Sequence, residues 1–257
     1  MTGSLSNDHA VKRNLNSKVA LVTGASRGIG KAIAVRLAAD GASVVVNYAG
    51  SADQAAATVK EIEEHGGRAI SIQADVSKIA DVKRMFDETT EVFGNPNVLV
   101  NNAGIMFNKP IVEMDEQEFD RLIAVNLKGT LFCCQEAGKR MTDGGHIINL
   151  SSSTTLMMLP NYGAYVASKG AVEQLSRVLA KELGSKKINV NIVSPGPTDT
   201  ELFNQGKSEE QKQNFAQMAA LGRLGAPDDI ASVVAMLVSA DAGWISGQNI
   251  RVNGGLV

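Results

Sequence analysis

The sequence is poor in aromatic residues and cysteine and has no excess of charge, and each shortage excludes a class of function. Aromatic residues make up 4% of the 257 residues, with a single tryptophan, which argues against a surface that stacks nucleobases or sugars. Lysine and arginine number 25 against 27 acidic residues, so the formal net charge is -2. Without a basic excess, we expect neither a nucleic acid nor an anionic membrane as a partner.

The two cysteines, Cys133 and Cys134, are adjacent in the chain. Neighbouring cysteines rarely form a disulfide with each other, and two thiols alone cannot build a tetrahedral sulfur site. The three histidines, His9, His65 and His146, show no ligand spacing, so we expect no metal site. This use of cysteine predicts a reduced, cytoplasmic protein.

Long apolar runs are also missing. No segment approaches about 18 consecutive apolar residues, the length that a membrane-spanning helix needs. The first 17 residues are polar and lack the apolar core of a signal peptide, so we expect residues 1–17 to form a disordered tail outside the fold. Residues 18–257 contain no internal repeat, linker or low-complexity tract, which predicts a single domain.

Short runs rich in β-branched residues alternate with helical patterns from Lys18 onward. Several of these runs are almost continuously apolar, as strands buried on both faces of a parallel sheet are. The alternation predicts an α/β fold with a doubly wound, Rossmann-like parallel sheet. The predicted strands cover residues 19–23, 43–47, 69–74, 98–101, 146–150, 188–193 and 249–252.

One stretch, between Pro195 and Pro227, is too long for an ordinary connection between a strand and a helix. Long connections of this kind commonly close over a ligand. We therefore expect a substrate lid near residues 198–221.

Three glycines follow the first predicted strand directly, at positions 24, 28 and 30. Glycine at these positions allows a tight turn, close approach of the backbone to a pyrophosphate, and close packing of helix on strand. The helix that begins here offers free N–H groups and the positive end of its dipole to phosphate. An ordinary tight turn is the alternative, but the strand, turn and helix context favours a dinucleotide site.

Three motifs in this order resemble the short-chain dehydrogenase/reductase family. They are the glycine turn, the run Asn101-Asn-Ala-Gly104 after the fourth predicted strand, and Tyr165 followed four positions later by Lys169. The resemblance extends from residue 18 to the end of the chain. Further matches are Asp75-Val76, Asn126, Pro195-Gly196 and Gly247-Gln248.

The resemblance implies a nicotinamide dinucleotide cofactor and roles for several residues. Asp75 is expected to meet the adenine edge, Lys169 to hold the nicotinamide ribose, and Asn126 to position a water in a proton relay. The complete set of expected cofactor contacts is Gly24, Ser26, Arg27, Gly28, Ile29, Gly30, Asn47, Tyr48, Ser51, Asp75, Val76, Asn102, Ala103, Gly104, Tyr165, Lys169, Pro195, Gly196, Thr198 and Thr200.

The spacing of Tyr165 and Lys169 places both side chains on one face of a helix. A phenol with its ordinary pKa of about 10 exchanges protons poorly near neutrality. We expect Lys169 to lower the pKa of Tyr165, which then acts as the general acid/base on a carbonyl oxygen. Ser152, chosen from the run of three serines by its family-like distance to Tyr165, is expected to bind the same oxygen. Tyr162 has no lysine four positions on, so it is not a candidate.

The end of the second predicted strand indicates NADP(H) in preference to NAD(H). NAD-dependent enzymes of this fold carry an acid there for the ribose 2′-hydroxyl, whereas Asn47 stands in its place here. Arg27 in the glycine turn supplies a cation for a 2′-phosphate, and Ser51 adds a hydroxyl at a helix start. The alternative is dual coenzyme specificity.

The residues expected around the substrate are apolar and rich in methionine, which favours a small hydrophobic ketone or aldehyde. Reduction of a 3-oxoacyl group on acyl carrier protein is the first alternative. It requires a basic surface near the cleft, for which the candidates are Lys139, Arg140, Lys186 and Lys187. The expected pocket wall comprises Met106, Phe107, residues 156–160, Leu202, Phe203 and Met218.

A dinucleotide-sensing protein without catalysis is the second alternative, and the intact set of Asn126, Ser152, Tyr165 and Lys169 argues against it. The resemblance also implies a homotetramer, joined through helices that match residues 115–139 and 165–183 with the last strand at a second contact.

Overall fold

The structure is a computed structural model that describes residues 15–257. Its centre is a seven-stranded parallel sheet in the order β3-β2-β1-β4-β5-β6-β7. All seven predicted strands are confirmed, with boundaries that differ by two residues at most. They are β1 (Val19–Val22), β2 (Ser43–Tyr48), β3 (Arg68–Gln73), β4 (Val98–Asn101), β5 (His146–Leu150), β6 (Asn189–Pro195) and β7 (Asn249–Val252).

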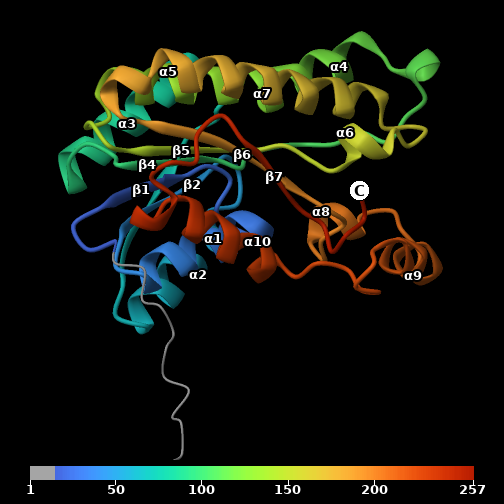
Figure 1. Cartoon of the computed structure of the whole chain (residues 1–257), viewed down its shortest axis with the longest axis horizontal. Helices are drawn as coiled ribbons and strands as arrows, with labels where there is room; N and C mark the ends of the chain where they lie inside the picture. The colour runs from blue at the N-terminus through green and yellow to red at the C-terminus, as the bar shows by residue number, and fades with distance from the viewer. Residues whose placement is uncertain (1–14) are drawn as a thin grey trace, which may run out of the picture.

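Helices cover both faces of the sheet (Figure 1). One layer contains α1 (Gly28–Ala39), α2 (Ala52–Glu64) and α10 (Pro227–Leu237). The opposite layer contains α3 (Ile79–Phe93), α4 (Glu116–Ile123), α5 (Gly129–Arg140) and α7 (Gly163–Glu182). The described part of the chain also contains four single turns: η1 (Ile111–Glu113), the π-helical η2 (Ala124–Lys128), η3 (Gly184–Lys186) and η4 (Ala240–Ala242).

Alternate residues of the central strands feed two separate cores. In β1, Ala20 and Val22 pack with α1 and α10, whereas Leu21 points to the other face and packs with α3 and α5. Every residue of β1 and β4 is buried, which explains their continuous apolar sequence. The doubly wound fold predicted from the alternation of runs is confirmed.

Three short helices lie beyond the carboxyl ends of the strands. They are α6 (Thr154–Met157), α8 (Glu201–Asn204) and α9 (Glu209–Met218). A reciprocal cap starts α9, because Ser208 accepts from the Gln211 N–H while the Gln211 side chain accepts from the Ser208 N–H. Both α8 and α9 belong to residues 198–221, which we call the lid segment.

The predicted boundary between tail and domain is wrong by at least three residues. Leu15 is 3% exposed and belongs to the core beside α1, and its N–H donates to the carbonyl oxygen of Asp40. One apolar side chain in a polar stretch is enough to tie the segment down, and a window average conceals it. The prediction of a tail over residues 1–14 lies outside the described residues. Within residues 15–257, no helix combines the length and apolar character needed to cross a membrane.

Candidate active site

The glycine turn between β1 and α1 forms a cradle that larger residues would fill. Gly24 and Gly28 have φ values of +62° and +55°, which glycine adopts without strain. A Cβ on Gly30 would lie 2.3 Å from the carbonyl oxygen of Gly24 and 2.4 Å from Nδ2 of Asn102. That Asn102 amide donates to the carbonyl oxygens of Thr23 and Gly24 and so holds the turn against β4.

A groove of about 280 Å³ extends from this cradle along the carboxyl ends of β2, β3 and β4. Asp75 lies in it, and its carboxylate accepts from both the N–H and the hydroxyl of Ser77. Burial alone would raise the pKa of Asp75, but these hydrogen bonds lower it below its ordinary value. A glycine cradle at the start of a 12-residue helix, continued by a groove with a fixed carboxylate, fits a dinucleotide.

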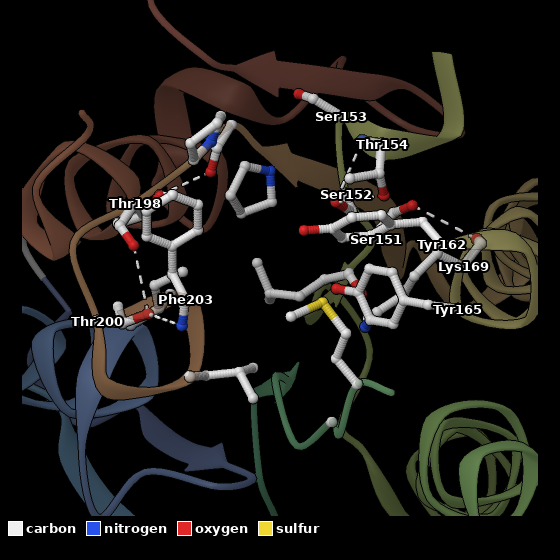
Figure 2. A pocket seen from close by; sticks show the side chains of 18 of the residues that line it. Ser151, Ser152, Ser153, Thr154, Tyr162, Tyr165, Lys169, Thr198, Thr200 and Phe203 are labelled. Carbon is white, nitrogen blue, oxygen red and sulfur yellow. Dashed lines mark hydrogen bonds between the residues drawn. The ribbon is translucent and has the colours of Figure 1, made fainter. Parts of the chain in front are cut away.

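A second cavity, of about 150 Å³, adjoins the groove (Figure 2). The two share Ile29, Asn102, Gly104, Thr200 and Leu202 in their walls. Every predicted cofactor contact lines one of the two cavities. The groove takes the residues of the glycine turn, the ends of β2, β3 and β4, and Thr200, while the second cavity takes Tyr165, Lys169, Pro195, Gly196 and Thr198.

Asn47 does not play the part that its position in the sequence suggested. It is 1% exposed, and its amide accepts from the Gly24 N–H and donates to the carbonyl oxygens of Ile72 and Ala74. Successive side chains of a strand point to opposite faces, so the half-buried side chain of Tyr48 lies on the face opposite to that of Asn47. The groove wall continues from Tyr48 through residues 49–51. Asn47 supports the floor of the groove and is not free to recognise a ribose.

Arg27 and Ser51 lie where the sequence placed them. Arg27 precedes α1 with its side chain 56% exposed, and Ser51 precedes α2. The Arg27 guanidinium pairs with the carboxylate of Glu201 at 3.0 Å, which joins the glycine turn to the lid segment. Glu201 is not among the residues predicted from the sequence, because nothing in the local pattern indicates a contact between residues 174 positions apart.

Tyr165, Lys169 and Ser152 line the second cavity, and Figure 2 shows them on one side of it, opposite Phe203. Lys169 is 5% exposed, and its Nζ donates to the carbonyl oxygen of Leu150 at 2.8 Å. The same Nζ lies 5.8 Å from the centroid of the Tyr165 ring. The Ser152 hydroxyl lies near enough to the Tyr165 phenol to lower its pKa. The i, i+4 spacing thus delivers both side chains of α7 to one place.

The expected direction of the Tyr165 pKa is wrong for this structure. Burial raises the pKa of Tyr165 to about 12, although the hydrogen bond with Ser152 lowers it in part. Burial also lowers the pKa of Lys169 to about 8. Lys169 is buried and Tyr165 partly buried, and the loss of hydration disfavours the charged form of each.

Asn126 lies in the π-helical turn η2 between α4 and α5 and is fully buried. Its amide accepts from the Ile105 N–H and donates to the Ile105 carbonyl oxygen and the Ser168 hydroxyl. A Cβ on Gly104 would lie 3.4 Å from Asn126 Oδ1 and 3.5 Å from Lys169 Nζ, so these two atoms flank Gly104. Such turns recur at functional sites.

The apolar wall of the second cavity differs in part from the prediction. Met106, Leu202 and Phe203 line it, as do Met157 and Leu159 from residues 156–160. Phe107 and Met218 do not, and Met158 is 78% exposed because its left-handed φ of +49° turns it outward. Tyr162, excluded as a catalytic candidate, and Phe215 of α9 also line the cavity, and the Phe215 ring packs edge-on against Phe203.

The basic residues proposed for an acyl carrier protein lie at the wrong edge of the sheet. Lys139 and Arg140 end α5, where both pair with Glu136. Lys186 and Lys187 immediately precede β6, and the Lys186 carbonyl accepts from Gly144 just before β5. All four therefore lie at the amino ends of β5 and β6, whereas both cavities open at the carboxyl ends.

The cysteines and metal-binding residue types form no second centre in the described residues. Cys133 and Cys134 are buried free thiols, and burial raises the pKa of Cys134 to about 12. Within residues 15–257, no group of three or more histidine, cysteine, aspartate or glutamate side chains is placed to hold a metal ion.

Comparison with known proteins places this site in context. A family model described as enoyl-(acyl carrier protein) reductase matches residues 24–257. A short-chain type dehydrogenase/reductase of Picea abies is 42% identical over 253 residues, covering 95% of this chain and 93% of that protein.

Two solved structures extend the comparison. The angucycline C-6 ketoreductase LanV with bound NADP has a TM-score of 0.89 and 43% identity, covering 95% of this chain and 96% of that one. A short-chain dehydrogenase from Burkholderia cenocepacia in complex with NADP has a TM-score of 0.90 and 38% identity, covering 95% of this chain and 99% of that one.

Proposed function

Because the chain belongs to the short-chain dehydrogenase/reductase family, we propose that it is an NADPH-dependent reductase of small hydrophobic ketones or aldehydes, reversible toward alcohol oxidation. The observation that carries the proposal is that Ser152, Tyr165 and Lys169 share one apolar cavity, and that this cavity adjoins the glycine-cradled groove.

Tyr165 is the general acid of the proposed reaction. With a pKa of about 12 the phenol keeps its proton at neutral pH, which is the form that donates to a carbonyl oxygen. Ser152 donates a hydrogen bond to the same oxygen, and the two donors together stabilise the developing negative charge. NADPH, when bound, supplies the hydride. Lys169 binds the nicotinamide ribose and, as a cation, stabilises the phenolate that Tyr165 becomes after it has given up its proton.

Two features of this chain favour NADP(H). Arg27 is exposed at the start of α1 and free to turn from Glu201 toward a 2′-phosphate. Residues 47–51, which follow the groove from β2, include no carboxylate that would repel the phosphate. Both solved relatives described above carry NADP. Arg27→Ala together with Tyr48→Asp should therefore shift the preference toward NADH, measured as the ratio of kcat/KM for the two coenzymes.

The substrate class follows from the cavity wall. Methionine, leucine and phenylalanine side chains surround the catalytic groups, and Figure 2 places Phe203 across the cavity from Tyr162 and Tyr165. Such a wall suits an apolar, ring-bearing ketone better than a phosphorylated sugar. LanV is a ketoreductase of an angucycline, which supports a ketone as the substrate here.

The decisive experiment is NADPH oxidation against ketones, aldehydes, 3-oxoacyl thioesters and enoyl thioesters. Turnover of hydrophobic ketones above the thioesters supports the proposal. Preference for a 3-oxoacyl thioester would establish the first alternative instead, although the basic residues lie away from the cleft. NADPH binding without turnover of any carbonyl would establish the dinucleotide-sensing alternative.

Assembly and lid movement are part of the same proposal. We propose a homotetramer joined through the faces of α5 and α7, where Leu131 and Val178 are exposed. We also propose that the lid segment closes when cofactor and substrate bind. Sedimentation gives the assembly, and hydrogen exchange over residues 198–221 with and without ligands tests the closure.

A further inference from the structure

Two threonines of α6 make four hydrogen bonds to Ser152. The N–H and hydroxyl of Thr154 both donate to Ser152 Oγ, at 3.2 and 2.8 Å. The N–H and hydroxyl of Thr155 both donate to the Ser152 carbonyl oxygen, at 3.2 and 2.9 Å. The first turn of this short helix is thus organised around one serine. Thr154 binds its hydroxyl oxygen, whereas Thr155 binds its carbonyl oxygen.

The hydrogen bonds from Thr154 determine which hydrogen-bonding role remains open to the Ser152 hydroxyl. A serine hydroxyl has one proton and two lone pairs. Thr154 donates to the oxygen twice, so both lone pairs are engaged and only the proton remains. Ser152 is 9% exposed, and it lines the second cavity together with Thr154, Tyr165 and Lys169, so the catalytic groups rather than bulk water surround this hydroxyl.

The neighbouring phenol is consistent with that assignment. The hydrogen bond with Ser152 lowers the pKa of Tyr165, which is the effect of a donor on a phenol oxygen.

We propose that Thr154 is a positioning residue for the reaction, because its two hydrogen bonds hold Ser152 as a hydrogen-bond donor to the substrate oxygen. The inference rests on the proposed carbonyl reduction. Thr154 itself needs no contact with substrate or cofactor for this role. Preorganised donors of this kind lower the barrier because they need no reorientation when charge develops on the oxygen.

Thr154→Val removes the hydroxyl and keeps the shape of the side chain. We expect kcat for ketone reduction to fall about 5- to 10-fold, the worth of one hydrogen bond, with the Kd for NADPH unchanged. Thr154→Ser should restore kcat to within about twofold, because it returns the donor. If the valine variant does not fold, Thr154→Ala removes the same hydroxyl without its methyl group.

A double-mutant cycle with Ser152→Ala separates positioning from general support of the fold. If Thr154 acts through Ser152, Thr154→Val has no further effect on kcat once Ser152 is alanine. Equal losses in both backgrounds would overturn the inference. The pH profile of alcohol oxidation provides a second readout: Thr154→Val should move the apparent pKa of the base upward, because Tyr165 loses a directed donor.

Thr155→Val is the matched control. It deletes the same group one residue on, but that hydroxyl bonds the Ser152 carbonyl and Glu173 rather than the Ser152 hydroxyl. We expect its kcat and pH profile to stay near those of the wild type, measured well below its Tm. A loss equal to that of Thr154→Val would show that helix integrity matters instead. A wild-type protein that reduces no carbonyl would refute the proposed function, whereas an active wild type with an unchanged Thr154→Val variant would refute only this inference.

Discussion

Arg27 and Glu201 form an ion pair of 3.0 Å that links the phosphate cradle to the lid segment. Both side chains are more than half exposed, and both line the cofactor groove. Surface pairs of this kind contribute little to stability, because water screens the charges and two long side chains must be ordered. The Arg27–Glu201 pair matters for binding instead, because the carboxylate of Glu201 and a 2′-phosphate would compete for the Arg27 guanidinium.

Glu201→Gln should therefore tighten NADPH binding without changing Tm appreciably. Removal of one negative charge beside the proposed phosphate site should lower the Kd about 2- to 5-fold at low salt, with less effect at high salt. The Kd for NADH should not change. Fluorescence titration measures both. Glu209→Gln, which breaks a pair with Lys212 on α9, is the control. An equal gain for both coenzymes would contradict competition for Arg27.

Tyr165→Phe should abolish most turnover while cofactor binding survives. The substitution keeps the ring and removes only the proton donor, so kcat should fall about 10²- to 10⁴-fold. Tyr162→Phe is the matched control, since Tyr162 lines the same cavity without a lysine one turn on. Its kcat should stay within a few-fold of the wild type. If the two variants lose activity equally, the assignment of Tyr165 fails.

Acid should destabilise the fold through His146. Burial, with a smaller contribution from Lys18, lowers the pKa of His146 from 6.5 to about 4. Below pH 6.5 His146 is protonated in the unfolded chain but stays neutral in the folded chain until the pH approaches 4. The contribution of neutral His146 to the free energy of unfolding is therefore fully present above pH 6.5 and is lost as the pH falls toward 4. The loss should be on the order of 2–3 kcal/mol in the free energy of unfolding.

His146→Gln should flatten the dependence of unfolding free energy on pH between 6.5 and 4.5, as measured by urea titration at each pH. His65→Gln should leave the slope unchanged, because His65 is exposed at the end of α2. A slope that persists in the His146 variant would assign the acid sensitivity to other groups.

Gly30→Ala should damage both fold and cofactor site. Its Cβ would meet the Gly24 carbonyl oxygen and the Asn102 amide at distances that real Cβ atoms do not adopt. We expect a loss of about 1–3 kcal/mol and at least tenfold weaker NADPH binding. Gly170→Ala, in the interior of α7 with open space around its Cβ position, should instead gain about 0.5–1 kcal/mol. Thermal unfolding and NADPH titration compare them; comparable Tm values would contradict the clash.

The sequence predicted whatever depends on spacing along one element. Short runs rich in β-branched residues identified all seven strands, and the four-residue spacing placed Tyr165 beside Lys169. The prediction from sequence failed where a side chain forms hydrogen bonds with residues distant in the chain. Asn47 is held by backbone groups of β3 and the glycine turn, and no local pattern reveals which face of β2 its amide takes.

Pocket walls were predictable only in part for the same reason. Phe215 reaches the cavity because α9 folds back so that its ring packs on Phe203, and this depends on the path of the lid segment rather than on helical periodicity. The pKa of Tyr165 depends on its depth in the protein, which the i, i+4 spacing does not encode. Thr154 could not be predicted, because nothing in the sequence indicates that its N–H and its hydroxyl both donate to Ser152 Oγ.

The π-helical turn at Ala124–Lys128 has a consequence for insertions and deletions in this region. A π turn holds one more residue than the α-helical path between the same points. Loss of a single residue from it would restore regular hydrogen bonding from α4 into α5 and leave both flanking helices in register, so only the side chains within the turn would change direction, by up to about 100°. Asn126 would then lose its hydrogen bonds to Ile105 and Ser168, so a deletion that makes the helix regular would disrupt the support of the segment that follows β4.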